Sequence, residues 1–99
     1  MSFTNNAQLL EMSKKQSVNK RGKWQVILHN DDVNTFDYVI DCLMQICGHS
    51  YIQSAQCAHL VHTKLQCSIF VDSYEECESV FEELHAQALT VSISKYKKI

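Results

Sequence analysis

The sequence WQVILHNDD, residues 24–32, decides how this chain folds. From Trp24 to Leu28 every residue except Gln25 is aromatic, β-branched or otherwise apolar, a composition typical of a strand buried in a sheet. The stretch then changes at His29 to polar residues that favour turns, and it ends with two consecutive aspartates. It therefore predicts a buried strand followed directly by a polar loop.

The segment after this loop predicts a helix over residues 36–47. Apolar residues recur there at the spacing of one helical face, at Phe36, Val39, Ile40, Leu43 and Cys47. Asn34 or Thr35 is suited to the N-cap, and Gly48 is suited to the left-handed position after the last turn. The first strand and this helix are thus joined by only a short connection.

A second helix, another strand, a third helix and a last strand follow along the chain. Ser50 is a suitable N-cap for the second helix, and Ser73 with Glu76 forms the pattern of a capping box for the third. Residues 67–71 and 89–93 have strand composition. The expected buried stripes are Ala55, Ala58, Val61 and Leu65 on the second helix, and Cys77, Val80, Phe81, Leu84 and Ala88 on the third.

The resulting order is β-α-α-β-α-β, which predicts a single small α+β domain with a three-stranded sheet and helices packed on one face. We expect this domain to cover residues 23–95. Residues 1–22 are polar and aperiodic, which predicts a flexible N-terminal arm, and residues 96–99 are expected to form a basic tail.

Charge is unevenly distributed along the chain although the net charge is only −2. Residues 1–23 carry five basic side chains and one acid, residues 24–94 carry ten acids and one lysine, and residues 95–99 carry three lysines. An acidic body repels phosphate backbones, so nucleic acid is not an expected partner. No apolar run is long enough to span a membrane and the N-terminus lacks the pattern of a secretory signal, so we expect a cytoplasmic protein.

The chemistry-bearing residues do not predict a cofactor or a metal site. Prolines are absent and the only glycines are Gly22 and Gly48, which excludes a glycine-rich phosphate loop. The five cysteines lack the paired spacing of structural zinc sites; the nearest approach is Cys57 with His59 and His62, which would lie on different helical faces. No motif marks a nucleophilic cysteine, so a Cys–His enzyme is a minor alternative and no catalytic residue is predicted.

The polar loop Asn30-Asp31-Asp32 allows two interpretations. Binding groups often occupy loops held between rigid elements, and this loop joins a strand to a helix. The same residues also suit an Asx turn and a helix cap without any binding role.

Residues 24–32, together with Leu60-Val61-His62 at the end of the second helix, resemble the ClpS adaptor family. The family pattern is an apolar strand, then N-D-D, then a helix, with V-H some thirty residues later, and its element order agrees. The resemblance covers residues 23–95. It implies a bacterial adaptor that recognises proteins with a bulky hydrophobic N-terminal residue and delivers them to the N-domain of a ClpA- or ClpC-type unfoldase for degradation by ClpP.

By that resemblance, Asn30, Asp31 and His62 would bind the α-amino group of the substrate. The pocket for its side chain would be lined by Leu28, Phe36, Val39, Ala58 and Val61. Glu75 matches a family glutamate that contacts the unfoldase.

The chain departs from the family pattern at three single positions, and it also lacks the glycine-rich stretch that follows V-H in the family. Phe36 replaces a methionine that guards the pocket, Ala58 replaces a larger apolar residue, and Val80 stands in place of a lysine on the third helix. An alternative interpretation is therefore a protein-interaction module that keeps the fold and has lost recognition of N-terminal residues. Closure of the pocket by Phe36 would favour that alternative.

Overall fold

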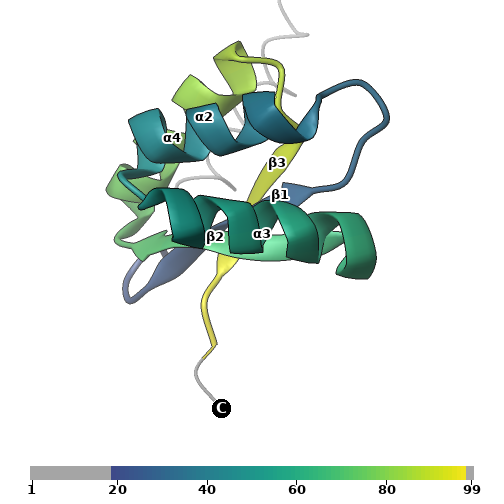
Figure 1. Ribbon diagram of the computed structural model, residues 1–99. Coiled ribbons are helices and arrows are strands. Elements are labelled where there is room, and N and C mark those ends of the chain that lie inside the picture. Colours follow the sequence, from purple (N-terminus) through teal and green to yellow (C-terminus); the bar gives the residue numbers. More distant parts are fainter. Residues whose placement is uncertain (1–18, 98–99) are drawn as a thin grey trace, which may run out of the picture.

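The computed structural model describes residues 19–97 of the chain. Most of the predicted arm and the last two residues of the predicted tail lie outside the described residues. The α+β class and the order β-α-α-β-α-β are confirmed (Figure 1). The elements are β1 (Trp24–His29), α2 (Phe36–Cys47), α3 (Tyr51–Lys64), β2 (Gln66–Asp72), α4 (Tyr74–Ala86) and β3 (Val91–Lys95).

The first strand lies in the centre of the sheet, with β2 and β3 as its antiparallel neighbours. Its alternation explains this position, because Val26 and Leu28 point to one face and are almost completely buried, whereas Gln25, Ile27 and His29 on the other face are half-buried. The ladder with β2 shifts register between Val26 and Ile27. A central strand with one fully buried face thus organises the whole domain.

The three helices supply the other half of the core over the face of Val26 and Leu28. One continuous cluster joins buried residues of all six elements or their flanks: Val26, Leu28, Cys42, Leu43, Cys57, Val61, Ile69, Cys77, Val80, Leu84 and Leu89. Three of the five cysteines belong to this cluster and act as small apolar side chains.

Each helix begins at a hydroxyl side chain that caps its first turn. Thr35 Oγ1 accepts from Tyr38 N at 3.1 Å and Ser50 Oγ accepts from Gln53 N at 3.1 Å. Ser73 Oγ likewise accepts from the backbone of Glu76 at 3.3 Å. The predicted caps at Ser50 and Ser73 are confirmed, and Thr35 rather than Asn34 caps α2.

The reciprocal half of the predicted capping box at α4 is not formed. The backbone N–H of Ser73 donates to Asp72 Oδ1 at 2.7 Å. This N–H is the group that the Glu76 side chain would accept from in a capping box, and Asp72 occupies it instead.

Two residues predicted on buried helical stripes are exposed turn residues instead. Leu65 has φ 76° and Ala88 has φ 67°, and both follow the last residues of their helices. The left-handed conformation ends a helix, which the apolar spacing could not reveal. The third strand consequently begins at Val91 rather than at Leu89, although Leu89 is buried as expected.

The buried face of α3 is also rotated from the predicted stripe. It consists of Ser54, Cys57, Ala58 and Val61, whereas Ala55 lies on its margin.

Among the described residues, no helix is both long and apolar enough to cross a membrane.

The turn at Leu65 matters for the binding region because its carbonyl accepts from Asn30 N at 3.0 Å. Its side chain is 64% exposed, so removing it sacrifices little burial. Relief of the left-handed strain outweighs the greater freedom of glycine in the unfolded chain, so Leu65→Gly is expected to raise the free energy of unfolding by roughly 0.5 kcal/mol. Urea titration measures this change.

Gly48→Ala is the matched control at the end of α2. Gly48 has φ 73°, and nothing lies within 4 Å of an added Cβ, so only backbone strain is introduced. This variant is expected to lose about 1 kcal/mol. Two substitutions that shift stability in the same direction would contradict the assignment of strain to Leu65.

Candidate functional site

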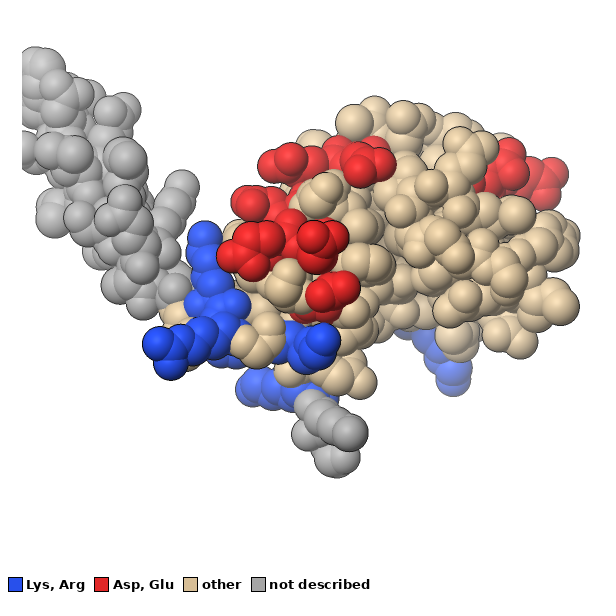
Figure 2. All heavy atoms as spheres, turned by 90° about the vertical axis from the view of Figure 1, so that its left-hand side faces the viewer, with Lys and Arg blue, Asp and Glu red and all other residues tan. Residues whose placement is uncertain are grey.

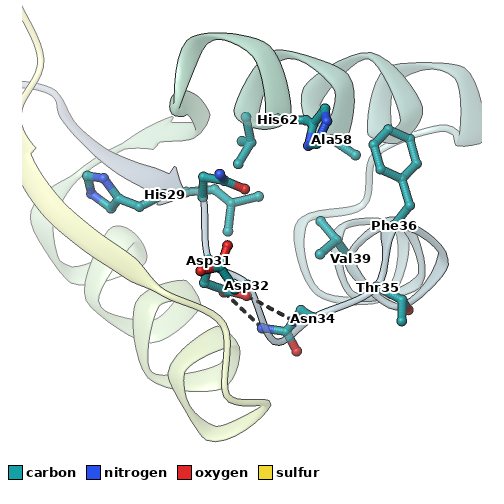
Figure 3. Close-up of a pocket in the computed structure, with 12 residues that line it drawn as sticks. His29, Asp31, Asp32, Asn34, Thr35, Phe36, Val39, Ala58 and His62 are labelled. Carbon is teal, nitrogen blue, oxygen red and sulfur yellow. Dashed lines mark hydrogen bonds between the residues drawn. The ribbon is translucent and has the colours of Figure 1, made fainter.

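A cavity of about 360 Å³ opens between the loop after β1, the first turns of α2 and the second half of α3. Figure 3 shows its lining. It is lined by Leu28, His29, Asn30, Asp31, Asp32, Asn34, Thr35, Phe36, Val39, Ala58, Val61 and His62.

The apolar part of the cavity is built on rigid elements. Leu28 comes from the buried face of β1, and Ala58 and Val61 come from the buried face of α3. Val39 adds a half-buried side chain from α2. These four side chains offer a binding surface without hydrogen-bonding groups, which suits one apolar side chain of a ligand.

Phe36 lies at the margin of the cavity and does not close it. It is the first residue of α2 and is 46% exposed. In Figure 3 its ring points towards α3, beside Ala58, while the space in front of Val39 stays open. The larger side chain at position 36 therefore faces the smaller one at position 58.

The polar loop is organised by the carboxylate of Asp31. Oδ1 accepts from the backbone N–H groups of Val33 at 3.0 Å and Asn34 at 2.9 Å. Oδ2 accepts from Asn34 Nδ2 at 3.0 Å and from Thr90 Oγ1 at 3.2 Å. This geometry is the Asx turn that one interpretation of the sequence predicted.

The same hydrogen bonds determine the protonation of Asp31. Partial burial raises the pKa of its carboxyl, but the bonds from Asn34, Val33 and Thr90 together bring it below its ordinary value of 3.8. Because the pKa of Asp31 in the folded protein lies below 3.8, the ionised carboxylate stabilises the fold at pH values above 3.8. This stabilisation is lost as the pH falls through the folded pKa.

Asn34 ties the loop to a distant part of the chain. Its side-chain Nδ2 donates both to Asp31 and to the carbonyl of Ala88, at 3.0 Å in each case. Tyr38 Oη donates to the neighbouring carbonyl of Gln87 at 2.9 Å. The turn between α4 and β3 therefore holds the polar side of the cavity in place.

Three polar side chains at the cavity remain free for a ligand. Asn30, Asp32 and His62 are exposed, and their side chains form no hydrogen bond within residues 19–97. In Figure 3 Asp32 comes from the loop and His62 from α3 on the opposite side. A ligand with hydrogen-bond donors placed between them would find acceptors on both sides.

Eight of the nine residues predicted for the site line this one cavity, and Glu75 alone lies elsewhere. Sequence reasoning missed the contributions of Asp32, Asn34 and Thr35. Asp32 could have been predicted from the sequence, because it belongs to the polar loop Asn30-Asp31-Asp32. His29 also lines the cavity, but its ring points towards β3 in Figure 3 and its Nε2 lies 2.8 Å from Ser92 Oγ.

Glu75 lies in the first turn of α4, on the outside of the domain. The exposed face of this helix carries five glutamates, and a basic end of the domain lies beside it (Figure 2). Val80, at which the family lysine is missing, is 8% exposed and packs in the core. Glu75 is therefore exposed on the surface of α4, whereas the side chain of Val80 faces inward.

The described residues hold no group of three or more metal-ligating side chains. Cys57 is buried in the core, apart from the exposed His59 and His62. Burial raises the pKa of the Cys47 and Cys67 thiols to about 12, and it raises those of Cys42 and Cys77 as well. These four thiols are protonated at neutral pH, unlike a catalytic thiolate.

Comparisons with known proteins agree with this arrangement. The family described as ATP-dependent Clp protease adaptor protein ClpS matches residues 19–92. A ClpS adapter protein from Prochlorococcus marinus is 32% identical over 92 residues, 92% of this chain and 88% of the relative. One from Synechocystis sp. is 31% identical over 70 residues, 70% of this chain and 71% of the relative.

A solved structure has the same fold. The structure of Agrobacterium tumefaciens ClpS2 bound to L-phenylalaninamide aligns with a TM-score of 0.69 at 19% identity, covering 75% of this chain and 96% of that one.

These similarities define an adaptor of an ATP-dependent protease, a protein that binds other proteins and is not an enzyme. The chain belongs to the ClpS family. Family membership confirms the resemblance that residues 24–32 and Leu60-Val61-His62 predicted.

Replacement of Asn34 tests how the polar loop is held. Asn34→Ala removes both bonds of Nδ2 and is expected to lower the free energy of unfolding by about 1 kcal/mol. It is also expected to raise the pKa of Asp31 towards its ordinary value, because a donor to the ionised carboxylate is lost. Urea titration and a carboxyl NMR titration measure the two effects.

Asn30→Ala is the matched control because it removes a neighbouring amide that has no side-chain hydrogen bond in the described residues. This variant is expected to change neither quantity. An Asn34→Ala protein as stable as the parent, with an unshifted Asp31, would show that the bridge is not maintained in solution.

Proposed function

We propose that this adaptor recognises proteins by a free N-terminus that carries a bulky hydrophobic first residue. The observation that supports this most directly is the open cavity, which places an apolar wall next to exposed acceptors. An N-terminal leucine or phenylalanine carries the two matching features, an α-ammonium group and an apolar side chain, on the same Cα atom. The shape of the apolar part of the cavity then determines which N-terminal residues of substrates bind best.

Hydrogen bonds and charge have separate tasks in this proposal. The α-ammonium group has three donors, and acceptors are provided by Asn30, Asp32 and His62, whose side chains form no hydrogen bond within residues 19–97. The carboxylate of Asp31 already accepts four hydrogen bonds. Its main contribution is therefore the negative charge that it places beside the ammonium group. A direct hydrogen bond from the ammonium group to Oδ2 would have to displace the 3.2 Å bond from Thr90 Oγ1.

The apolar part supplies affinity. Complete burial of a phenylalanine or leucine side chain contributes about 2–3 kcal/mol. The ligand in the A. tumefaciens ClpS2 structure, L-phenylalaninamide, carries a free α-amino group and a phenyl side chain. That ligand has the same two features that this cavity would bind.

The exposed position of Phe36 supports retained recognition over the alternative of an interaction module without it. The cavity stays open, and Phe36 with Ala58 changes its shape. We therefore place Phe36 among the residues that select the first residue of a substrate.

We further propose delivery to the N-domain of a ClpA- or ClpC-type unfoldase in the bacterial cytoplasm. Glu75 lies on the exposed acidic face of α4, away from the substrate cavity, so one adaptor can contact both partners. The five free cysteines are consistent with a reducing compartment. Residues 1–22 are proposed to serve delivery rather than peptide binding.

Peptides that differ only at their first residue test recognition. In a fluorescence-anisotropy titration, peptides that begin with phenylalanine or leucine are expected to bind, and one that begins with serine is expected to bind at least tenfold more weakly. Acetylation of the phenylalanine peptide removes the charge and two donors and is expected to have an effect of at least the same size. Equal affinity for the free and acetylated peptides would contradict the proposal.

Two histidines of α3 provide a matched pair for the site itself. His62 lines the cavity, and His59 is equally part of α3 but does not. His62→Ala is expected to weaken binding of the phenylalanine peptide more than tenfold, about 1.4 kcal/mol, whereas His59→Ala is expected to bind like the parent. Similar losses in both variants would indicate a general disturbance of α3 instead of a contact at His62.

A further inference from the structure

Helix α3 carries a second apolar surface that has no part in the substrate cavity. This surface, here called the α3 patch, consists of Tyr51, Ile52, Ala55, Gln56, His59 and Leu60. Its large side chains are 62%, 69% and 42% exposed at positions 51, 52 and 60. The cavity uses the other side of the helix, through Ala58, Val61 and His62, so no residue is shared.

The α3 patch contains no formally charged side chain, whereas the exposed face of α4 is strongly acidic. A contiguous exposed apolar surface in a small domain commonly marks an interaction site. Its large apolar side chains fit an apolar segment, and it has no carboxylate, lysine or arginine to pair with a charged one.

The patch is too small for a stable dimer. α3 has 14 residues, so its length is about 21 Å and the width of its exposed side about 10 Å. Two such surfaces facing each other would bury a few hundred Å², well below the ~1,200 Å² of stable interfaces. A short apolar segment is a better match to this area than a second folded copy.

The chain itself contains such a segment outside the described residues. Leu9, Leu10 and Met12 are closely spaced large apolar residues in a stretch whose other residues from 4 to 17 are polar except for Ala7. Only residues 13–18 separate this segment from Asn19, where the described part of the chain begins, and they span up to about 20 Å.

The chain enters the domain at the end of the sheet where β1 begins, with Lys20 Nζ 4.4 Å from the ring centroid of Tyr74 at the start of α4. Trp24 at the start of β1 pairs with Asp72 at the end of β2. His49, two residues before α3, is hydrogen-bonded through Nε2 to the carbonyl of Ile69 at 2.7 Å. The start of α3 is therefore fixed beside the middle of β2, and in Figure 1 it lies at the left of the view, as the start of β1 does.

We propose that Leu9, Leu10 and Met12 dock on the α3 patch of the same chain while the adaptor is free. A short tether provides an effective concentration in the millimolar range, so even a millimolar intrinsic dissociation constant leaves about half of the molecules docked. Docking of this strength covers the patch and yet releases the segment readily to a competing partner.

Amide chemical shifts of the full-length chain, recorded without substrate or unfoldase, test this contact. Leu9→Ser/Leu10→Ser is expected to shift the amides of Tyr51, Ile52, Ala55, His59 and Leu60. The control Asn5→Ser/Asn6→Ser, in the same segment of the chain, is expected to leave them in place. In the reciprocal experiment, Ile52→Ser is expected to shift residues 9–12, whereas Val33→Ser, at a residue 85% exposed outside the patch, is not.

Shifts of the same size over a tenfold dilution would support docking within one chain. Shifts that decrease on dilution would assign the surface to a second copy and overturn the proposal. Absence of any effect of Leu9→Ser/Leu10→Ser on α3 would overturn it as well and leave the patch to another protein. Since no substrate is present, either result is independent of the proposed recognition of N-terminal residues.

Discussion

The cavity of this adaptor depends on the ionised carboxylate of Asp31. Four donors converge on it, two from the backbone of its own loop, one from the side chain of Asn34 and one from Thr90 next to the last strand. These bonds stabilise the turn by which the chain leaves the central strand and reaches Thr35, the N-cap of α2. A protonated or absent carboxylate would free the loop on the side where β1, α2 and α3 face each other, and that is where the cavity lies.

Rigid elements hold the apolar part of the cavity, while the loop holds its polar part. Leu28 and Val61 are anchored in the same core cluster, so their positions follow from the packing of the whole domain. The polar side is fixed instead by local hydrogen bonds and by the bridge from Asn34 to Ala88. Changes in the core would therefore alter affinity through stability, whereas changes in the loop would alter the alignment of acceptors with little effect on the fold.

The sequence predicted the fold well because β1 has the composition of a buried strand and the apolar residues of the helices recur at helical spacing. It failed where a single backbone conformation ends an element: Leu65 and Ala88 continue the apolar spacing, yet both adopt positive φ and are exposed. The residues around the cavity were predicted from the family resemblance, since N-D-D by itself also fits an Asx turn. The structure shows that Asp31 forms that turn, and spacing alone could not have indicated that its oxygens are occupied by Asn34 and Thr90.

The side chains of α3 explain how one short helix provides two different surfaces. Its inward face consists of Ser54, Cys57, Ala58 and Val61, and the small side chain of Ala58 borders the cavity together with Val39 and Phe36. Its outward face has large apolar residues that stay 42–69% exposed, so folding buries only part of their apolar surface. A helix selected only for stability would have the opposite arrangement, with large residues inside and polar ones outside. Both departures from that pattern are consistent with binding at α3, of a substrate on one side and of an apolar segment on the other.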